Sequence, residues 1–231
     1  MRSQETRLGV VVFFLAVSAF GLGISASLLG NSAPFPSEFS GRRALVALVY
    51  GAVCVAGILA VLFPVACSGF LGIQRSLAED KGSLETGATR VFSLLLLHGH
   101  HPAGSGERSH ELWLGGKSYC ATCYGLLTGA IASLTAIVAF ALSGWADGPF
   151  AYTLYYVGVA VVILGLVVGL VLRIGARTRF ALAAVFVLGT CLMLVATDVL
   201  TENFIADVFV VLLAVFWLLS RISLSHRREY R

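Results

Sequence analysis

Residues 151–172 read AYTLYYVGVAVVILGLVVGLVL, a run of 22 residues without a single charge. The hydrocarbon core of a bilayer is about 30 Å thick and a helix rises about 1.5 Å per residue, so about 20 apolar residues can cross it. This stretch therefore predicts a membrane-spanning helix. Five further apolar stretches predict spans at Leu8–Leu29, Ala44–Leu71, Tyr119–Leu142, Phe180–Leu200 and Phe204–Ser220.

The composition of the whole chain agrees with six spans. Of its 231 residues, 58% are hydrophobic and 12% are charged, which is about half the charged fraction of an average soluble domain. We predict an all-α fold, a single polytopic transmembrane helical bundle over residues 1–231 with one polar loop at 72–118. The first apolar run is also compatible with a cleaved signal peptide, but it is longer than the usual signal core of about 7–15 residues.

The distribution of Lys and Arg predicts the orientation of the bundle. With the amino terminus in the cytoplasm, the inner segments hold fourteen of the sixteen Lys and Arg, and the outer loops hold only Arg42 and Arg43. The positive-inside rule therefore predicts a cell-membrane protein with both termini and the 72–118 loop in the cytoplasm. The basic clusters are short, so we expect lipid headgroups and not nucleic acid as their partners.

Glycines four residues apart, Gly125 with Gly129 and Gly165 with Gly169, predict flat helix faces that allow close packing. The helix packed there belongs either to the same chain or to a second copy in a homo-oligomer.

Ionisable residues are scarce inside the predicted spans. Asp198 and Asp207 lie near the outer ends of the fifth and sixth spans, where we expect them to be hydrated. Ion-coupled transporters usually hold such groups near the middle of the membrane. The pattern therefore argues against a proton-coupled pump.

The polar loop and the start of the third span carry the residues suited to chemistry. Four of the five histidines and a C-x-x-C pair fall within residues 98–123: His98, His100, His101, His110, Cys120 and Cys123. Cysteines three apart at a helix start share one face, and the helix dipole there favours thiolate. Thiolate and imidazole together are ligands for zinc, while iron and copper stay open as alternatives.

We predict a metal site with Cys120, Cys123 and His101 as the first ligands. His100 or His98 supplies the fourth ligand, and His110 is a weaker candidate. A thiol redox pair and a polar loop without any ligand are the competing interpretations.

Two other features of the loop have open interpretations. Arg108 either holds an anionic group, pairs with Glu107 or Glu111, or is a solvated positive-inside charge. The apolar patch Val91–Leu97 is too short to span a bilayer, and we expect an interfacial or re-entrant helix there.

A resemblance to a known family rests on the residues around the cysteine pair. Glu107-Arg108-Ser109, then Gly115 or Gly116, then Cys120-x-x-Cys123-x-Gly125 resembles the signature of domain-of-unknown-function family 2085, small prokaryotic multi-pass membrane proteins. His101-Pro102 matches a His and a Pro of that family's Cys-His-Gln-x-Pro-Glu-Arg-Ser stretch.

The resemblance covers about residues 95–130, and this chain departs from the pattern at three places. His100 stands where the family has a cysteine, Ala103–Gly106 looks like an insertion, and Thr122 replaces an arginine. The resemblance implies the membrane fold and the site, but no activity.

Three functions follow from these observations. The first is a membrane protein, not expected to be an enzyme, whose loop is tied to the bundle by a metal ion. The second is a quinone-linked membrane thiol oxidoreductase that uses Cys120 and Cys123, although a second C-x-x-C for electron relay is missing. The third is a small-solute channel or exporter, suggested by hydroxyl residues within the spans: Ser18, Ser25, Thr128, Ser133 and Thr190. Such hydroxyls usually bond to their own helix backbone.

Overall fold

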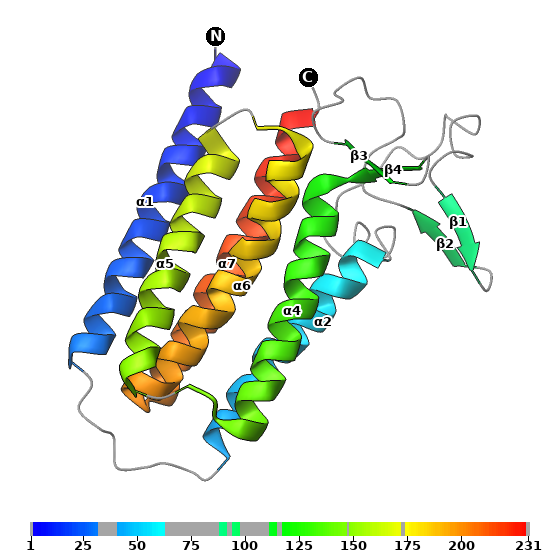
Figure 1. Ribbon diagram of the computed structural model, residues 1–231. Coiled ribbons are helices and arrows are strands. Elements are labelled where there is room, and N and C mark those ends of the chain that lie inside the picture. The colour runs from blue at the N-terminus through cyan, green and yellow to red at the C-terminus, as the bar shows by residue number, and fades with distance from the viewer. Residues whose placement is uncertain are drawn as a thin grey trace.

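The computed structural model describes residues 2–31, 41–62, 88–91, 94–97, 111–114, 117–146, 148–171 and 174–229. These ranges contain six long helices in one bundle and two short β-hairpins at one end of it (Figure 1). The helices are α1 (Arg2–Asn31), α2 (Arg42–Leu62), α4 (Ala121–Ser143), α5 (Gly148–Val171), α6 (Ala176–Thr201) and α7 (Phe204–Glu229). The prediction of an all-α polytopic bundle is confirmed.

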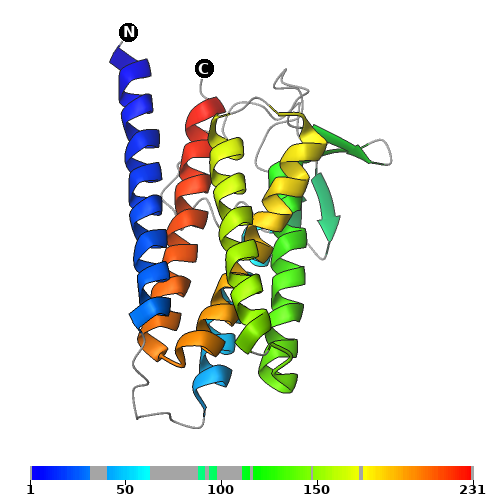
Figure 2. The same cartoon turned by 60° about the vertical axis from the view of Figure 1, so that its left-hand side comes forward.

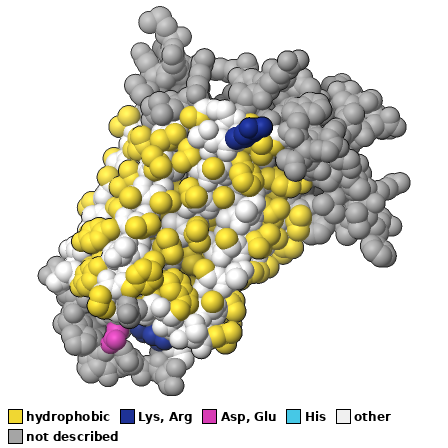
Figure 3. Space-filling view, in the orientation of Figure 1, with side chains coloured by type: hydrophobic (Ala, Val, Ile, Leu, Met, Phe, Trp, Pro, Cys, Tyr) yellow, Lys and Arg dark blue, Asp and Glu magenta, His cyan; other side chains and the backbone are white. Residues whose placement is uncertain are grey.

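Five of these helices are long and apolar enough to cross a membrane, namely α1, α2, α4, α5 and α6. In α7 the apolar part is shorter and covers Phe204–Ser220. Both termini lie at the same end of the bundle (Figure 1). Between the two ends, the described side chains on the face in Figure 3 are hydrophobic or uncharged, and the charged ones lie near the ends. The protein is therefore a multi-pass membrane protein whose outer surface suits contact with lipid.

Helix α6 is the centre of the bundle. Two thirds of its apolar window (67%) is buried inside the protein, against 39% or less for the other four spans. It packs against α4, α5 and α7, and Figure 2 shows α1 alongside α7 at the edge. A spanning helix enclosed by others can carry polar residues, because lipid does not reach them.

Small residues bring α4 and α5 close to α6. A side chain at Gly125 would collide with the backbone oxygen of Phe180, and one at Gly129 would lie 2.5 Å from the backbone oxygen of Ala184. On α5, a side chain at Gly165 would lie 2.9 Å from the ring of Phe186. All three glycines therefore serve packing within the chain, and that face of α4 is covered by α6.

Polar side chains join neighbouring helices inside the bundle. Tyr50 of α2 shares a 2.8 Å hydrogen bond with Thr190 of α6. Tyr155 of α5 donates to Ser25 of α1 over 3.0 Å. Such bonds hold transmembrane helices in register, each typically contributing about 0.6–2 kcal/mol.

The hydroxyl residues that suggested a channel mostly serve their own helices. Ser18, Thr128 and Thr190 each donate to a backbone carbonyl one turn earlier. Ser25 accepts a hydrogen bond from Tyr155 of α5, and the buried oxygen of Ser133 has no hydrogen-bond partner among the described residues.

The segment before α4 contains strands, and this corrects one expectation. Strand β1 (Ala88–Val91) pairs antiparallel with β2 (Leu94–Leu97), so the described residues of the patch Val91–Leu97 lie in strands and not in a helix. A seven-residue apolar run has no periodicity that separates the two structures. A second hairpin pairs β3 (Glu111–Leu114) with β4 (Lys117–Cys120) and leads directly into α4.

Candidate functional site

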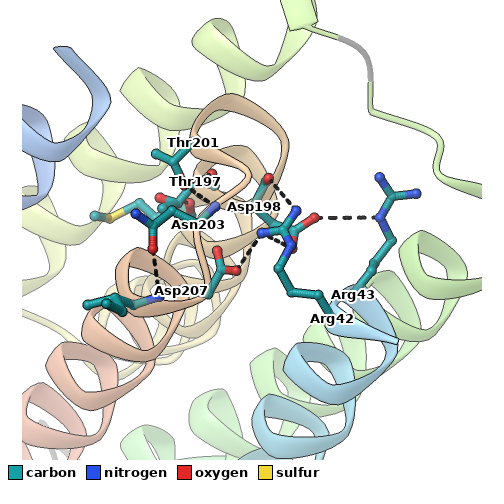
Figure 4. Close-up of polar contacts among 9 residues, drawn as sticks. Arg42, Arg43, Thr197, Asp198, Thr201, Asn203 and Asp207 are labelled. Atoms are coloured by element: carbon teal, nitrogen blue, oxygen red, sulfur yellow. Dashed lines mark hydrogen bonds and ion pairs between the residues drawn. The ribbon is translucent and has the colours of Figure 1, made fainter. Parts of the chain in front are cut away.

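A cluster of charged side chains lies at the end of the bundle opposite the two termini (Figures 1 and 4). Arg42, in the first turn of α2, donates from Nη1 to Oδ2 of Asp207 over 2.8 Å. The same nitrogen lies 3.1 Å from Oδ1 of Asp198, and Nη2 donates to the backbone oxygen of Asp198 over 3.2 Å. One guanidinium thus bridges α2, α6 and α7.

The short turn between α6 and α7 brings the two aspartates to the same level. Helix α6 ends at Thr201, and Glu202 follows in the left-handed conformation at φ 48°. Asn203 then caps α7, because its Oδ1 accepts the backbone N–H of Ile205 over 2.9 Å. Asp198 therefore lies one turn before the break and Asp207 one turn after it.

Arg43 contributes a second and weaker positive charge. Its Nε lies 3.5 Å from Oδ2 of Asp198, and its side chain is 46% exposed, compared with 11% for Arg42. The guanidinium also lies over the ring of Phe140 of α4, 4.8 Å from the centroid. It passes the end of α4 where Gly144, at φ 58°, leaves room for it. Solvent screens such a half-exposed charge.

The aspartates correct the expectation that both would be hydrated. The side chain of Asp198 is 1% exposed and that of Asp207 is 0% exposed. Burial of a carboxylate is costly unless it is paired, and here the pairs are made with arginine from a distant part of the chain. Their solvent-exposed neighbour Glu202 shows that the end of the bundle is accessible close by.

Sequence reasoning missed this cluster although a signal was present. Arg42 and Arg43 are the two arginines that the positive-inside rule leaves on the outer side, and Asp198 and Asp207 are the two acids in spans near that same side. Two pairs of opposite charge at one membrane level indicate an ion-pair network.

The predicted cysteine pair lies at the other end of the bundle. Cys120 is the last residue of β4 and the N-cap of α4, and Cys123 lies in the first turn of α4. Both residues are 9% exposed, and the structure has no disulfide between them. Residues three apart in a helical turn face the same way, as expected. The hairpin of β3 and β4 contacts the starts of α4 and α6, so the pair sits where hairpin and bundle meet.

The other predicted ligands lie outside the described residues: His98, His100, His101, His110, Arg108 and Glu107. Within the ranges that are described, no group of three or more His, Cys, Asp or Glu is placed to hold a metal ion. Of the predicted metal ligands, the structure therefore describes only Cys120 and Cys123.

In comparisons with known proteins, the chain matches no family model, no curated protein and no solved structure.

Proposed function

We propose that the protein holds a metal ion of the zinc class between Cys120, Cys123 and two histidines of the segment 98–110, and that this ion ties the polar segment to the bundle. The observation that carries the proposal is the position of the two thiols. They lie one turn apart at the start of α4, directly after a β-hairpin, and are almost buried. The proposal includes membership of the family of unknown function that the segment resembles.

The donor set fits such an ion. Zinc in structural sites takes four sulfur and nitrogen ligands, and a C-x-x-C at a helix start commonly supplies two of them. Peptide N–H groups at the start of α4 add positive potential that stabilises thiolate. In the hairpin, Glu111 pairs with Cys120, so the first described residue of β3 lies opposite the first cysteine. His101 and His100, or His98, are the proposed partners, with His110 as a substitute.

The direct test is the metal content of the purified full-length protein in detergent. We expect about one equivalent of metal in the wild type and a near-complete loss in the double variant Cys120→Ser/Cys123→Ser. The matched control is Cys54→Ser/Cys191→Ser, which replaces two thiols buried inside the bundle and should keep the metal. Equal metal content in the wild type and the Cys120/Cys123 variant would refute the proposal.

The same preparation separates the metal site from the thiol oxidoreductase. Trapping of thiols in cells should show Cys120 and Cys123 permanently reduced if they hold a metal. If the purified protein holds no metal and the pair cycles between dithiol and disulfide, the metal proposal fails and the thiol oxidoreductase function is supported instead.

A further inference from the structure

The two buried aspartates at the opposite end of the bundle have more acceptor atoms than the protein satisfies. Both carboxylate oxygens of Asp198 and Oδ1 of Asp207 are buried and have no hydrogen-bond partner among the described residues. The contacts of Asp198 with the arginines, at 3.1 and 3.5 Å, have the distance of ion pairs without hydrogen-bond alignment. An ionised carboxylate can only accept, so two adjacent carboxylates cannot satisfy one another.

The charges of the buried groups are also unequal. Asp198, Asp207 and Arg42 are nearly inaccessible to solvent, and together they carry one excess negative charge. Arg43 is the only other cation that the structure describes at this cluster, and it is half exposed and touches Asp198 at the longest distance of the network. Phe140 of α4 and Gly144, which follows that helix, adjoin Arg43 and cannot titrate. Glu202, in the turn, is exposed.

The two helix ends act oppositely on the two aspartates. Asp207 lies in the first turn of α7, where the helix dipole favours a negative charge. Asp198 lies in the last turn of α6, where the dipole opposes one. Arg42 offsets this at Asp198 by also donating to that residue's backbone oxygen.

We propose that Asp198 and Asp207 form a proton-binding site, in which the two carboxyl groups share one proton and Arg42 is the counter-ion. The proton adds to one carboxylate oxygen, and no covalent bond breaks. That oxygen then becomes a hydrogen-bond donor to an oxygen of the other aspartate, so one proton satisfies two of the buried acceptors. It also brings the buried charge of the three residues to zero. Closely spaced carboxylates that share a proton are a known arrangement in proteins.

A proton fits this place better than a metal cation. Calcium takes about six to eight oxygen ligands, and the described residues offer no group of three His, Cys, Asp or Glu here. Arg42 Nη1, 2.8 Å from Oδ2 of Asp207 and 3.1 Å from Oδ1 of Asp198, already places one positive charge beside both carboxylates. A cation placed there would be repelled by Arg42.

Infrared difference spectroscopy during a pH titration of the purified full-length protein tests this site. We expect a protonated-carboxyl band in the wild type that shifts when aspartate is carbon-13 labelled. The band should disappear in Asp198→Asn and in Asp207→Asn, and persist in the control Glu202→Gln. If the Asn variants do not fold, Asp207→Glu should keep a band at a changed frequency.

Arg43→Gln provides an independent readout, because loss of a nearby positive charge should move the titration midpoint of the band to higher pH. A wild type without a labelled carboxyl band throughout the pH range in which it is folded would overturn the proposal.

Discussion

Trp217 of α7 donates its indole N–H to the hydroxyl of Ser18 on α1 over 3.1 Å, and both side chains are buried. Ser18 in turn donates to the backbone oxygen of Phe14. This short chain of bonds joins two helices through residues that are 199 positions apart in the sequence, and it makes α1 a packed member of the bundle.

The first prediction concerns this bond. Ser18→Ala leaves the indole N–H of Trp217 without its acceptor, so we expect the free energy of unfolding to fall by about 0.6–2 kcal/mol. Ser143→Ala is the matched control, because Ser143 is exposed and also donates to a backbone carbonyl one turn earlier. Thermal unfolding in detergent, followed by circular dichroism, measures both. Equal effects of the two substitutions would contradict the bond.

The second prediction concerns the packing of α4 on α6. A methyl group at Gly129 would lie 2.5 Å from the backbone oxygen of Ala184, so Gly129→Ala should destabilise the bundle by about 1–3 kcal/mol. Gly23→Ala is the control, since nothing lies within 4 Å of a methyl group there. It should be neutral or stabilising by up to about 1 kcal/mol. Unfolding in detergent at several protein concentrations separates packing within the chain from association. A concentration-dependent effect would indicate a dimer face instead.

Much of the helical arrangement could be predicted because lipid imposes one strong constraint. A spanning segment needs about 20 apolar residues, and that length is visible in the composition alone. The predicted span Phe180–Leu200 falls within α6, Ala176–Thr201. Of the predicted span Ala44–Leu71, the structure describes α2 as far as Leu62, and residues 63–71 lie outside the described residues. The partners of the glycines could not be predicted, because spacing indicates a flat face and not the helix that covers it.

The third prediction concerns orientation, which the positive-inside rule predicts. Arg177 lies at the end of the bundle near the termini and Glu202 at the other end, and both are exposed. In intact cells, a membrane-impermeant maleimide should label Glu202→Cys and leave Arg177→Cys unlabelled until the membrane is broken. The wild type, whose described cysteines are buried, gives the background. The reverse labelling pattern would show that the termini face outward.

The charged cluster shows what is missed when each residue of a sequence is considered alone. Sequence position placed Asp198 and Asp207 close to the membrane surface, and that inference treated each residue alone. Their burial depends on Arg42, which lies 165 residues from Asp207 along the chain and 2.8 Å from it in space. Pairing of this kind is set by how α2, α6 and α7 pack, and no local pattern encodes it. At the cysteine pair, by contrast, the spacing alone predicts a shared face, because both residues belong to one helical turn.

The fourth prediction contrasts the two neighbouring arginines. Arg42→Gln leaves two buried carboxylates without their bridging cation, so we expect a loss of about 3–5 kcal/mol of stability at neutral pH. Arg43→Gln removes a half-exposed charge and should cost about 0–1 kcal/mol. Adding Asp207→Asn to Arg42→Gln should restore part of the loss, because one buried charge is then removed. Unfolding in detergent measures all three variants, and equal losses for the two arginines would show that burial does not distinguish them.

The fifth prediction concerns removal of the proposed metal. If an ion joins Cys120 and Cys123 to the histidine segment, a chelator should speed hydrogen exchange in β3, in β4 and in the first turn of α4. Exchange near the α6–α7 turn, at the far end of the bundle, should stay unchanged. His101→Ala should lower metal affinity by more than the roughly 10–100-fold that loss of an outer-shell group costs, because it removes a direct ligand. The variant Cys120→Ser/Cys123→Ser serves as the control. Its hydrogen exchange in these segments should already be fast, and the chelator should not change the exchange rate. A chelator that changes exchange equally in this variant and in the wild type would mean that the thiols do not hold the metal.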